Sequence, residues 1–208
     1  MTSSSPSFAD RERRELADLL AEVGPHAPTM CAGWDTAHLA AHLVVRERRP
    51  DALVGLGAEV VSGGGPLAQW PHRLEDRLRD STPYAEVVDR LRAGPPAWSP
   101  MSWPLVGGAL NTTEFAIHHE DVRRAQPGWT PRELPRAAQD ALWSAAGLFA
   151  RRAAAGRAGG LVLRRTDAPG KEKRFGDGGT AVEGEPMELL LWAVGRRDVA
   201  RVTVALAP

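Results

Sequence analysis

The stretch LVGGALNTTEFAIHHEDVRRA, residues 105–125, predicts one long helix that ends before Pro127. An α-helix advances about 100° per residue, so Glu114 and His118, four positions apart, lie about 40° apart on one face. Both side chains can therefore reach the same point in space. A carboxylate and an imidazole that meet in this way are two of the donor types that bind divalent cations in helical proteins.

The residues next to this pair divide into two groups by direction. Asp121 falls about 20° from Glu114 and extends the polar face, whereas His119 points about 100° away from His118. His118 is therefore the better ligand candidate of the two adjacent histidines. Asp121 could hold a ligand histidine in one tautomer, as carboxylates behind metal-binding histidines often do.

A second helix, predicted over about 35–49, could supply a third ligand. Leu39 and Leu43 mark its apolar stripe, and His42 lies about 60° from that stripe, at the edge of the face that should meet the other helices. Arg46 lies about 20° from Leu39, an unfavourable place for a cation unless an anion faces it. Arg46 could clamp a substrate carboxylate, or it could form an ion pair with a carboxylate of the protein such as Asp121.

Three ligands, His42, Glu114 and His118, would leave a coordination position open for water or substrate, which indicates reactivity as well as structure. The alternative is that Glu114 and His118 form a surface pair with i,i+4 spacing, while His42 is a hydrogen-bonded, half-buried histidine. Spacing alone leaves both interpretations open.

The rest of the chain predicts a helical part followed by a smaller mixed part. A glycine-rich connection is expected at 51–66, and the sequence changes character at 156–160. We expect an α+β fold, with a helical metal-binding domain at 1–155 and a small α/β domain at 156–208. Further helices are predicted at 8–23, 67–80, 83–93, 135–155 and 186–196, and strands at 161–165, 173–175 and 201–206.

Composition excludes several classes of partner and site. The 208 residues carry 26 basic and 26 acidic side chains, which argues against the basic surface that nucleic-acid binding needs. Cys31 is the only cysteine, so a metal would rest on imidazole and carboxylate ligands. No apolar run approaches the roughly 20 residues of a membrane span, and the N-terminus lacks a signal pattern, so we expect a cytoplasmic protein without a membrane partner.

Two segments carry a resemblance to a known family. The stretches GWDTAHLAAHLVVRERRP (33–50) and NTTEFAIHHEDVRRAQPGW (111–129) resemble the mycothiol-dependent maleylpyruvate isomerase family, a branch of the DinB-like metal-binding bundles, and are closest to an uncharacterised actinobacterial subgroup. The resemblance implies an up-and-down four-helix bundle followed by the small C-terminal unit. It also implies a divalent ion, usually zinc with nickel as the second candidate, on His42, Glu114 and His118.

The function that this resemblance implies is a metal-dependent thiol transferase or isomerase. Mycothiol would be the thiol cosubstrate and a small electrophile the substrate, in a protein that is a monomer or a homodimer. Arg46 would be the candidate anion clamp and Asp121 the candidate orienting carboxylate. The alternatives are a hydrolase that uses metal-bound water and a non-catalytic metal-binding stress protein. Dependence on an added thiol separates the first two.

Overall fold

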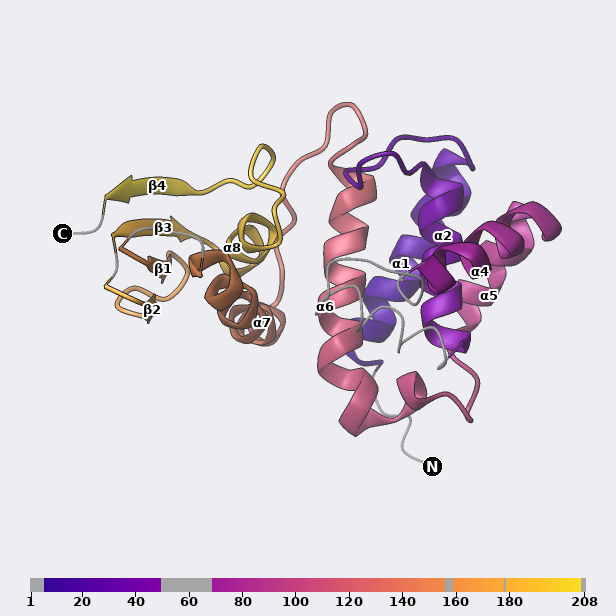
Figure 1. Ribbon diagram of the computed structural model, residues 1–208, viewed down its shortest axis with the longest axis horizontal. Helices are drawn as coiled ribbons and strands as arrows, with labels where there is room; N and C mark the ends of the chain where they lie inside the picture. Colours follow the sequence, from indigo (N-terminus) through magenta and orange to yellow (C-terminus); the bar gives the residue numbers. More distant parts are fainter. Residues whose placement is uncertain (1–5, 50–68, 156–158, 178, 207–208) are drawn as a thin grey trace. The chain divides into compact units, whose positions relative to one another are not determined.

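The computed structural model describes residues 6–49, 69–155, 159–177 and 179–206. The chain divides into two compact units, Met1–Thr130 and Pro131–Pro208. In its described part the first unit is helical, and the second combines helices with a small sheet (Figure 1). The expected α+β class is therefore confirmed. The glycine-rich connection expected at 51–66 lies outside the described residues.

Helices form the described part of the first unit, and the two that carry the candidate ligands pack among the others. Helix α1 packs against α5 and α6, and α2 packs against α4 and α5. A short 3-10 helix, η1, lies against α6. The elements are α1 (Phe8–Val23), α2 (Thr36–Arg48), α4 (Gln69–Ser81), α5 (Tyr84–Ala93), η1 (Pro100–Ser102) and α6 (Pro104–Arg123).

The core of this unit explains why α2 can hold polar groups away from water. Leu39 and Leu43 of α2 are fully buried together with Phe115 of α6. The burial of α2 is not confined to this stripe, because every residue from Leu39 to Glu47 is buried. The sequence placed His42 at the edge of the buried face, but the helix is enclosed on all sides. Its polar side chains must therefore find partners inside the protein.

A close approach between η1 and α6 fixes the start of the long helix. A Cβ atom at Gly107 would collide with the carbonyl oxygen of Met101, so only glycine allows this contact. The Asn111 side chain, one turn further along α6, donates to the same carbonyl at 2.9 Å. The glycine thus helps to set the position of Asn111, whose Oδ1 accepts a hydrogen bond from Arg46 of α2 at 2.8 Å.

The second unit is built on a four-stranded sheet with the order β2-β1-β3-β4. Strand β1 pairs antiparallel with β2 and parallel with β3, and β3 pairs antiparallel with β4. Strand β3 was not predicted. Its sequence, TAVEG, is short and contains alanine and glycine, both poor strand formers. The elements are α7 (Arg136–Ala154), β1 (Leu161–Arg165), β2 (Glu172–Phe175), β3 (Thr180–Gly184), α8 (Pro186–Ala193) and β4 (Thr203–Leu206).

Helix α7 belongs to the second unit. It packs against α8 and also contacts β1 and β2, and Figure 1 shows both helices beside the sheet. The sequence placed the division after residue 155 and so assigned this helix to the first domain, whereas the compact units divide at Thr130. An Ala-rich amphipathic helix shows that one face is buried, but it does not show which partner buries that face.

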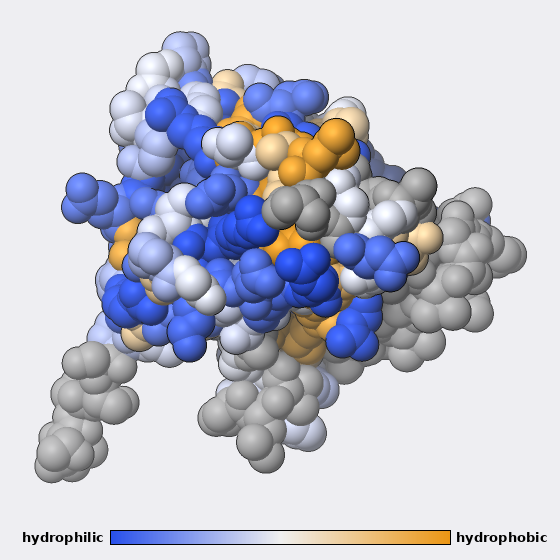
Figure 2. All heavy atoms as spheres, turned by 90° about the vertical axis from the view of Figure 1, so that its left-hand side faces the viewer, coloured by the Kyte–Doolittle hydropathy of each residue, from blue (hydrophilic) through white to orange (hydrophobic). Residues whose placement is uncertain are grey.

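On the face of the molecule that Figure 2 shows, hydrophobic residues lie at several places among hydrophilic ones. In the described part of the second unit, the large hydrophobic side chains left exposed are Leu148, Val204 and Leu206. None of the described helices is both long enough and apolar enough to span a bilayer.

Candidate metal centre

Helix α2 supplies His42, which is held at both ring nitrogens. The residue is buried, with an exposed fraction of 8%. Its Nε2 lies 3.1 Å from Oε1 of Glu114, and its Nδ1 lies 2.9 Å from Oε1 of Glu75 on α4. Trp34 packs against the imidazole with ring centroids 5.1 Å apart. The ring therefore has a fixed orientation, with its Nε2 edge directed at α6.

Helix α6 supplies Glu114 and His118 from one face, as their spacing predicts. The Nε2 of His118 lies 3.4 Å from Oε1 of Glu114, the same oxygen that His42 approaches. The rings of His42 and His118 are 5.5 Å apart between centroids. One oxygen and two imidazole nitrogens thus converge from two helices that are far apart in the sequence.

The three donor atoms fit a single small cation. Around a tetrahedral zinc ion with nitrogen and oxygen ligands at about 2.0–2.2 Å, neighbouring donor atoms are about 3.3–3.6 Å apart. The two distances to Glu114, 3.1 and 3.4 Å, are close to that range, and all three donor atoms lie within 4.8 Å of one another. The Glu114 side chain keeps 25% of its surface exposed, so solvent reaches this group of residues. His42, Glu114 and His118 could hold a divalent ion with a coordination position left over.

Each histidine is backed by a second carboxylate on its Nδ1 side. Glu75 occupies this place behind His42, and Asp121 lies 3.0 Å from Nδ1 of His118. A carboxylate that accepts from Nδ1–H keeps the proton on that nitrogen and leaves the lone pair of Nε2 free. Both lone pairs then point toward Glu114, which is the arrangement that metal-ligating histidines require.

Arg46 stands beside this group and is already engaged by the protein. Its Nε lies 3.5 Å from Oε1 of Glu114, and its Nη1 donates to Oδ1 of Asn111 at 2.8 Å. The residue is buried, with 6% of its surface exposed. The sequence left two roles open for Arg46, a clamp for a substrate carboxylate or an ion pair with a carboxylate of the protein. The structure shows an ion pair with Glu114.

The electrostatics favour charged groups here despite burial. Burial opposes a charged His42, but hydrogen bonds to Glu114 and Glu75 outweigh it and raise the pKa of this histidine. Burial likewise opposes a charged His118, whose pKa is raised well above its usual value by Asp121, Cys31 and Glu114. Burial would raise the pKa of Glu114, but Arg46 and the two histidines hold that pKa well below its usual value. A cation bound here would displace protons from the imidazoles.

The next two residues of α6 after His118, His119 and Glu120, are buried and bind other partners. His119 points away from His118, and its Nδ1 lies 3.0 Å from Oε2 of Glu12 on α1. Glu120 is buried and forms ion pairs with Arg123 and Arg124. The buried arc of α6 is therefore wider than the stripe that spacing suggests.

Sequence reasoning missed Glu75 and undervalued Cys31. Glu75 lies three positions before Leu78, about 60° from it on α4, the same relation to an apolar residue that singled out His42. Its other oxygen, Oε2, lies 3.1 Å from Nδ1 of His72. Sequence reasoning assigned Cys31 no ligand role, but its Sγ lies 3.2 Å from Oδ2 of Asp121.

Comparisons with known proteins identify solved structures with a similar fold. No profile of a known protein family matches the chain, and no curated protein matches it. Two solved structures do: the mycothiol-dependent maleylpyruvate isomerase, with a TM-score of 0.54 and 18% identity, and a histidine-to-alanine variant of that isomerase, with 0.57 and 17%. Each match covers 95% of this chain and 89% of the other. The likeness shows a shared fold.

The engagement of Arg46 leads to a prediction about stability. Arg46→Met removes the donor to Asn111 and the cation beside Glu114, so we expect the free energy of unfolding of the metal-free protein to fall by about 2 kcal/mol. Urea unfolding measures this, with Arg14→Met, at an exposed position of α1, as the control. An unchanged free energy of unfolding would show that Arg46 is not needed by the fold and is available for another role.

Proposed function

We propose that His42, Glu114 and His118 bind one divalent cation, with zinc the first candidate and nickel the second. The observation that supports this is the convergence of both Nε2 atoms on one oxygen of Glu114, at 3.1 and 3.4 Å. Nitrogen and oxygen donors suit zinc, and three protein ligands are typical of zinc sites that act on a substrate. Glu75 and Asp121 would orient the two histidines.

We further propose that the protein is a metal-dependent transferase or isomerase that uses a low-molecular-weight thiol, with mycothiol as the cosubstrate and a small electrophile as the substrate. Two observations support this together: the ligand set, and a fold shared over 95% of the chain with the mycothiol-dependent maleylpyruvate isomerase. Membership of that family, its up-and-down four-helix bundle and its actinobacterial subgroup remain part of the proposal, because 17–18% identity supports the fold alone.

The metal ion, the thiol cosubstrate and the protein side chains would have different roles in the reaction. A divalent cation bound here would lower the pKa of a coordinating thiol and so favour the thiolate near neutral pH. The nucleophile would then belong to the cosubstrate. His42 and His118 keep their lone pairs directed at one point because Glu75 and Asp121 hold their Nδ1 protons.

Arg46 is the candidate that would bind an anionic group of the substrate. It uses Nε and Nη1 toward Glu114 and Asn111, and a guanidinium has two further N–H groups on Nη2 that could meet a substrate carboxylate. In this role Arg46 would bind the substrate next to the cation while continuing to hold Glu114.

Metal content tests the ligand set. We expect the purified wild-type protein to hold about one equivalent of divalent metal and His42→Ala to lose it, because removing a ligand costs affinity heavily. His38→Ala is the matched control, since His38 is on the same helix, one turn earlier, and binds Asp35. Elemental analysis of both variants gives the answer. Metal retained in His42→Ala, or lost equally in His38→Ala, would place the ion elsewhere.

Turnover tests the activity. With maleylpyruvate as the trial electrophile, we expect turnover only when both mycothiol and metal are present, and a fall of more than about 100-fold in His42→Ala. The assay is repeated without thiol, and with ester substrates, on the same metal-loaded protein. Turnover without any thiol would identify a hydrolase. A metal-loaded protein inactive in every assay would be a binding protein.

A further inference from the structure

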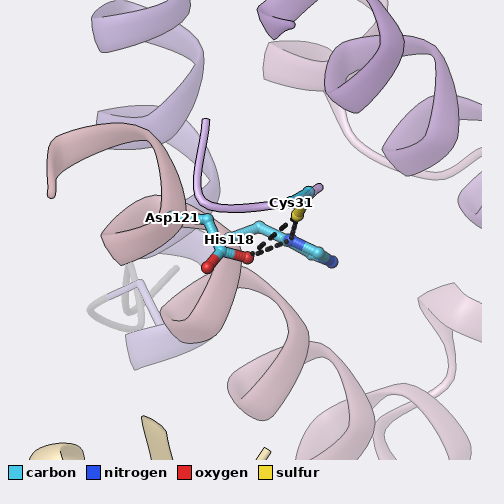
Figure 3. A group of neighbouring side chains, drawn as sticks. All are labelled: Cys31, His118 and Asp121. Carbon is cyan, nitrogen blue, oxygen red and sulfur yellow. Dashed lines mark hydrogen bonds and ion pairs between the residues drawn. The ribbon is translucent and has the colours of Figure 1, made fainter. Parts of the chain in front are cut away.

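The chain's single cysteine lies against the outer edge of His118. Its Sγ is 3.2 Å from Oδ2 of Asp121 and 3.8 Å from Nδ1 of His118, and that same Oδ2 is 3.0 Å from Nδ1. Figure 3 shows the three side chains directed toward one another, with Cys31 on the loop before α2 and the other two on α6. This group uses the Nδ1 edge of His118, whereas the candidate ligands described above use the Nε2 edge.

The loop that carries Cys31 is fixed to α6 by its backbone. The Met30 N–H donates to the Asp121 carbonyl at 2.9 Å, and the Cys31 N–H donates to Oγ1 of Thr29 at 3.1 Å. The Gln126 side chain donates to the Pro28 carbonyl at 3.1 Å. The sulfur is therefore held at a defined place, because three separate hydrogen bonds fix the chain at Pro28, Met30 and Cys31.

The donor atoms and their distances match a cation site. Neighbouring thiolate, imidazole and carboxylate donors around a tetrahedral zinc ion are about 3.4–3.6 Å apart, and the three observed distances of 3.0, 3.2 and 3.8 Å agree within about 0.4 Å. A larger ion such as Cd²⁺ would need the three side chains to move apart by several tenths of an ångström. A thiolate, a carboxylate and a neutral imidazole would also cancel the charge of a divalent ion. Cys31 is partly exposed while Asp121 is fully buried, which leaves an entry from the sulfur side.

We propose that Cys31, Asp121 and Nδ1 of His118 form a second cation site, for a soft, thiol-binding divalent ion such as Cd²⁺. Sulfur sets this site apart from the first, because a thiolate favours a soft ion such as Cd²⁺ more strongly than nitrogen and oxygen donors do, and the first site has only nitrogen and oxygen donors. This site goes beyond the proposed function and does not depend on it, since neither His42 nor Glu114 takes part.

Sharing His118 makes the two sites compete. When Nδ1 binds the soft ion, it loses the proton that it shares with Asp121, while Nε2 keeps its own proton, which faces Glu114. The thiol proton of Cys31 leaves as well, so binding releases two protons to solvent. A protonated Nε2 has no lone pair for the first site. A soft ion on Cys31 should therefore remove one of the three ligands proposed for zinc.

The simpler alternative is that Cys31 only donates a hydrogen bond to Asp121 and so helps to orient His118. The two interpretations differ in one observable, a bond between sulfur and metal. Because Cys31 is the only cysteine in the chain, a thiolate-to-metal absorption band has a single source.

The test is a Cd²⁺ titration of the full chain, followed by the ultraviolet thiolate-to-cadmium absorption, with a phosphine in place of thiol reductants. Two variants that disable the first site serve as hosts for the titration. His42→Ala removes one of its ligands, and Glu114→Gln removes the carboxylate but keeps the size of the side chain. We expect the band to rise to one equivalent in each host. Adding Cys31→Ser should abolish it and weaken Cd²⁺ binding by more than about 100-fold.

The zinc content of Cys31→Ser separates this proposal from the first. Serine still donates to Asp121, so that variant should keep about one equivalent of zinc on His42, Glu114 and His118. Absence of the cadmium band from both hosts, or Cd²⁺ binding that survives Cys31→Ser unchanged, would overturn the second site and leave the first intact.

Discussion

One oxygen of Glu114 is approached by two imidazole nitrogens, and the rest of the site follows from that convergence. Three positive or protonatable groups, His42, His118 and Arg46, surround it in a region from which most water is excluded. Charges buried in this way are stable only when every one has a partner. Glu75 and Asp121 meet this requirement on the outer side of each histidine. The same two carboxylates fix the tautomers that a cation would need.

Much of the helical architecture could be predicted from the sequence because helix ends carry strong local signals. The first helix was expected at 8–23 and is Phe8–Val23, with Ser7 as its cap and Gly24 at its end. The long helix, expected at 105–125, is Pro104–Arg123. Strand β3 and the partner of α7 were missed. Both depend on which elements meet in three dimensions, and the periodicity of one segment does not contain that information.

The candidate ligands could be selected from the sequence because helical geometry makes Glu114 and His118 neighbours and places His42 near a buried face. Their convergence is seen in the structure, whereas their role as metal ligands remains a proposal. The partners behind them were harder to find. Glu75 lies 33 residues from His42 and Cys31 lies 87 residues from His118, and neither contact has a local sequence signal. Asp121 was identified because it shares a helix with His118.

Anomalous diffraction at the zinc edge, from crystals of the zinc-loaded protein, tests the arrangement most directly. We expect one strong peak at about 2.0–2.2 Å from Nε2 of His42, Nε2 of His118 and a carboxylate oxygen of Glu114. A peak bound through the Nδ1 atoms, or at residues that exclude Glu114, would contradict it.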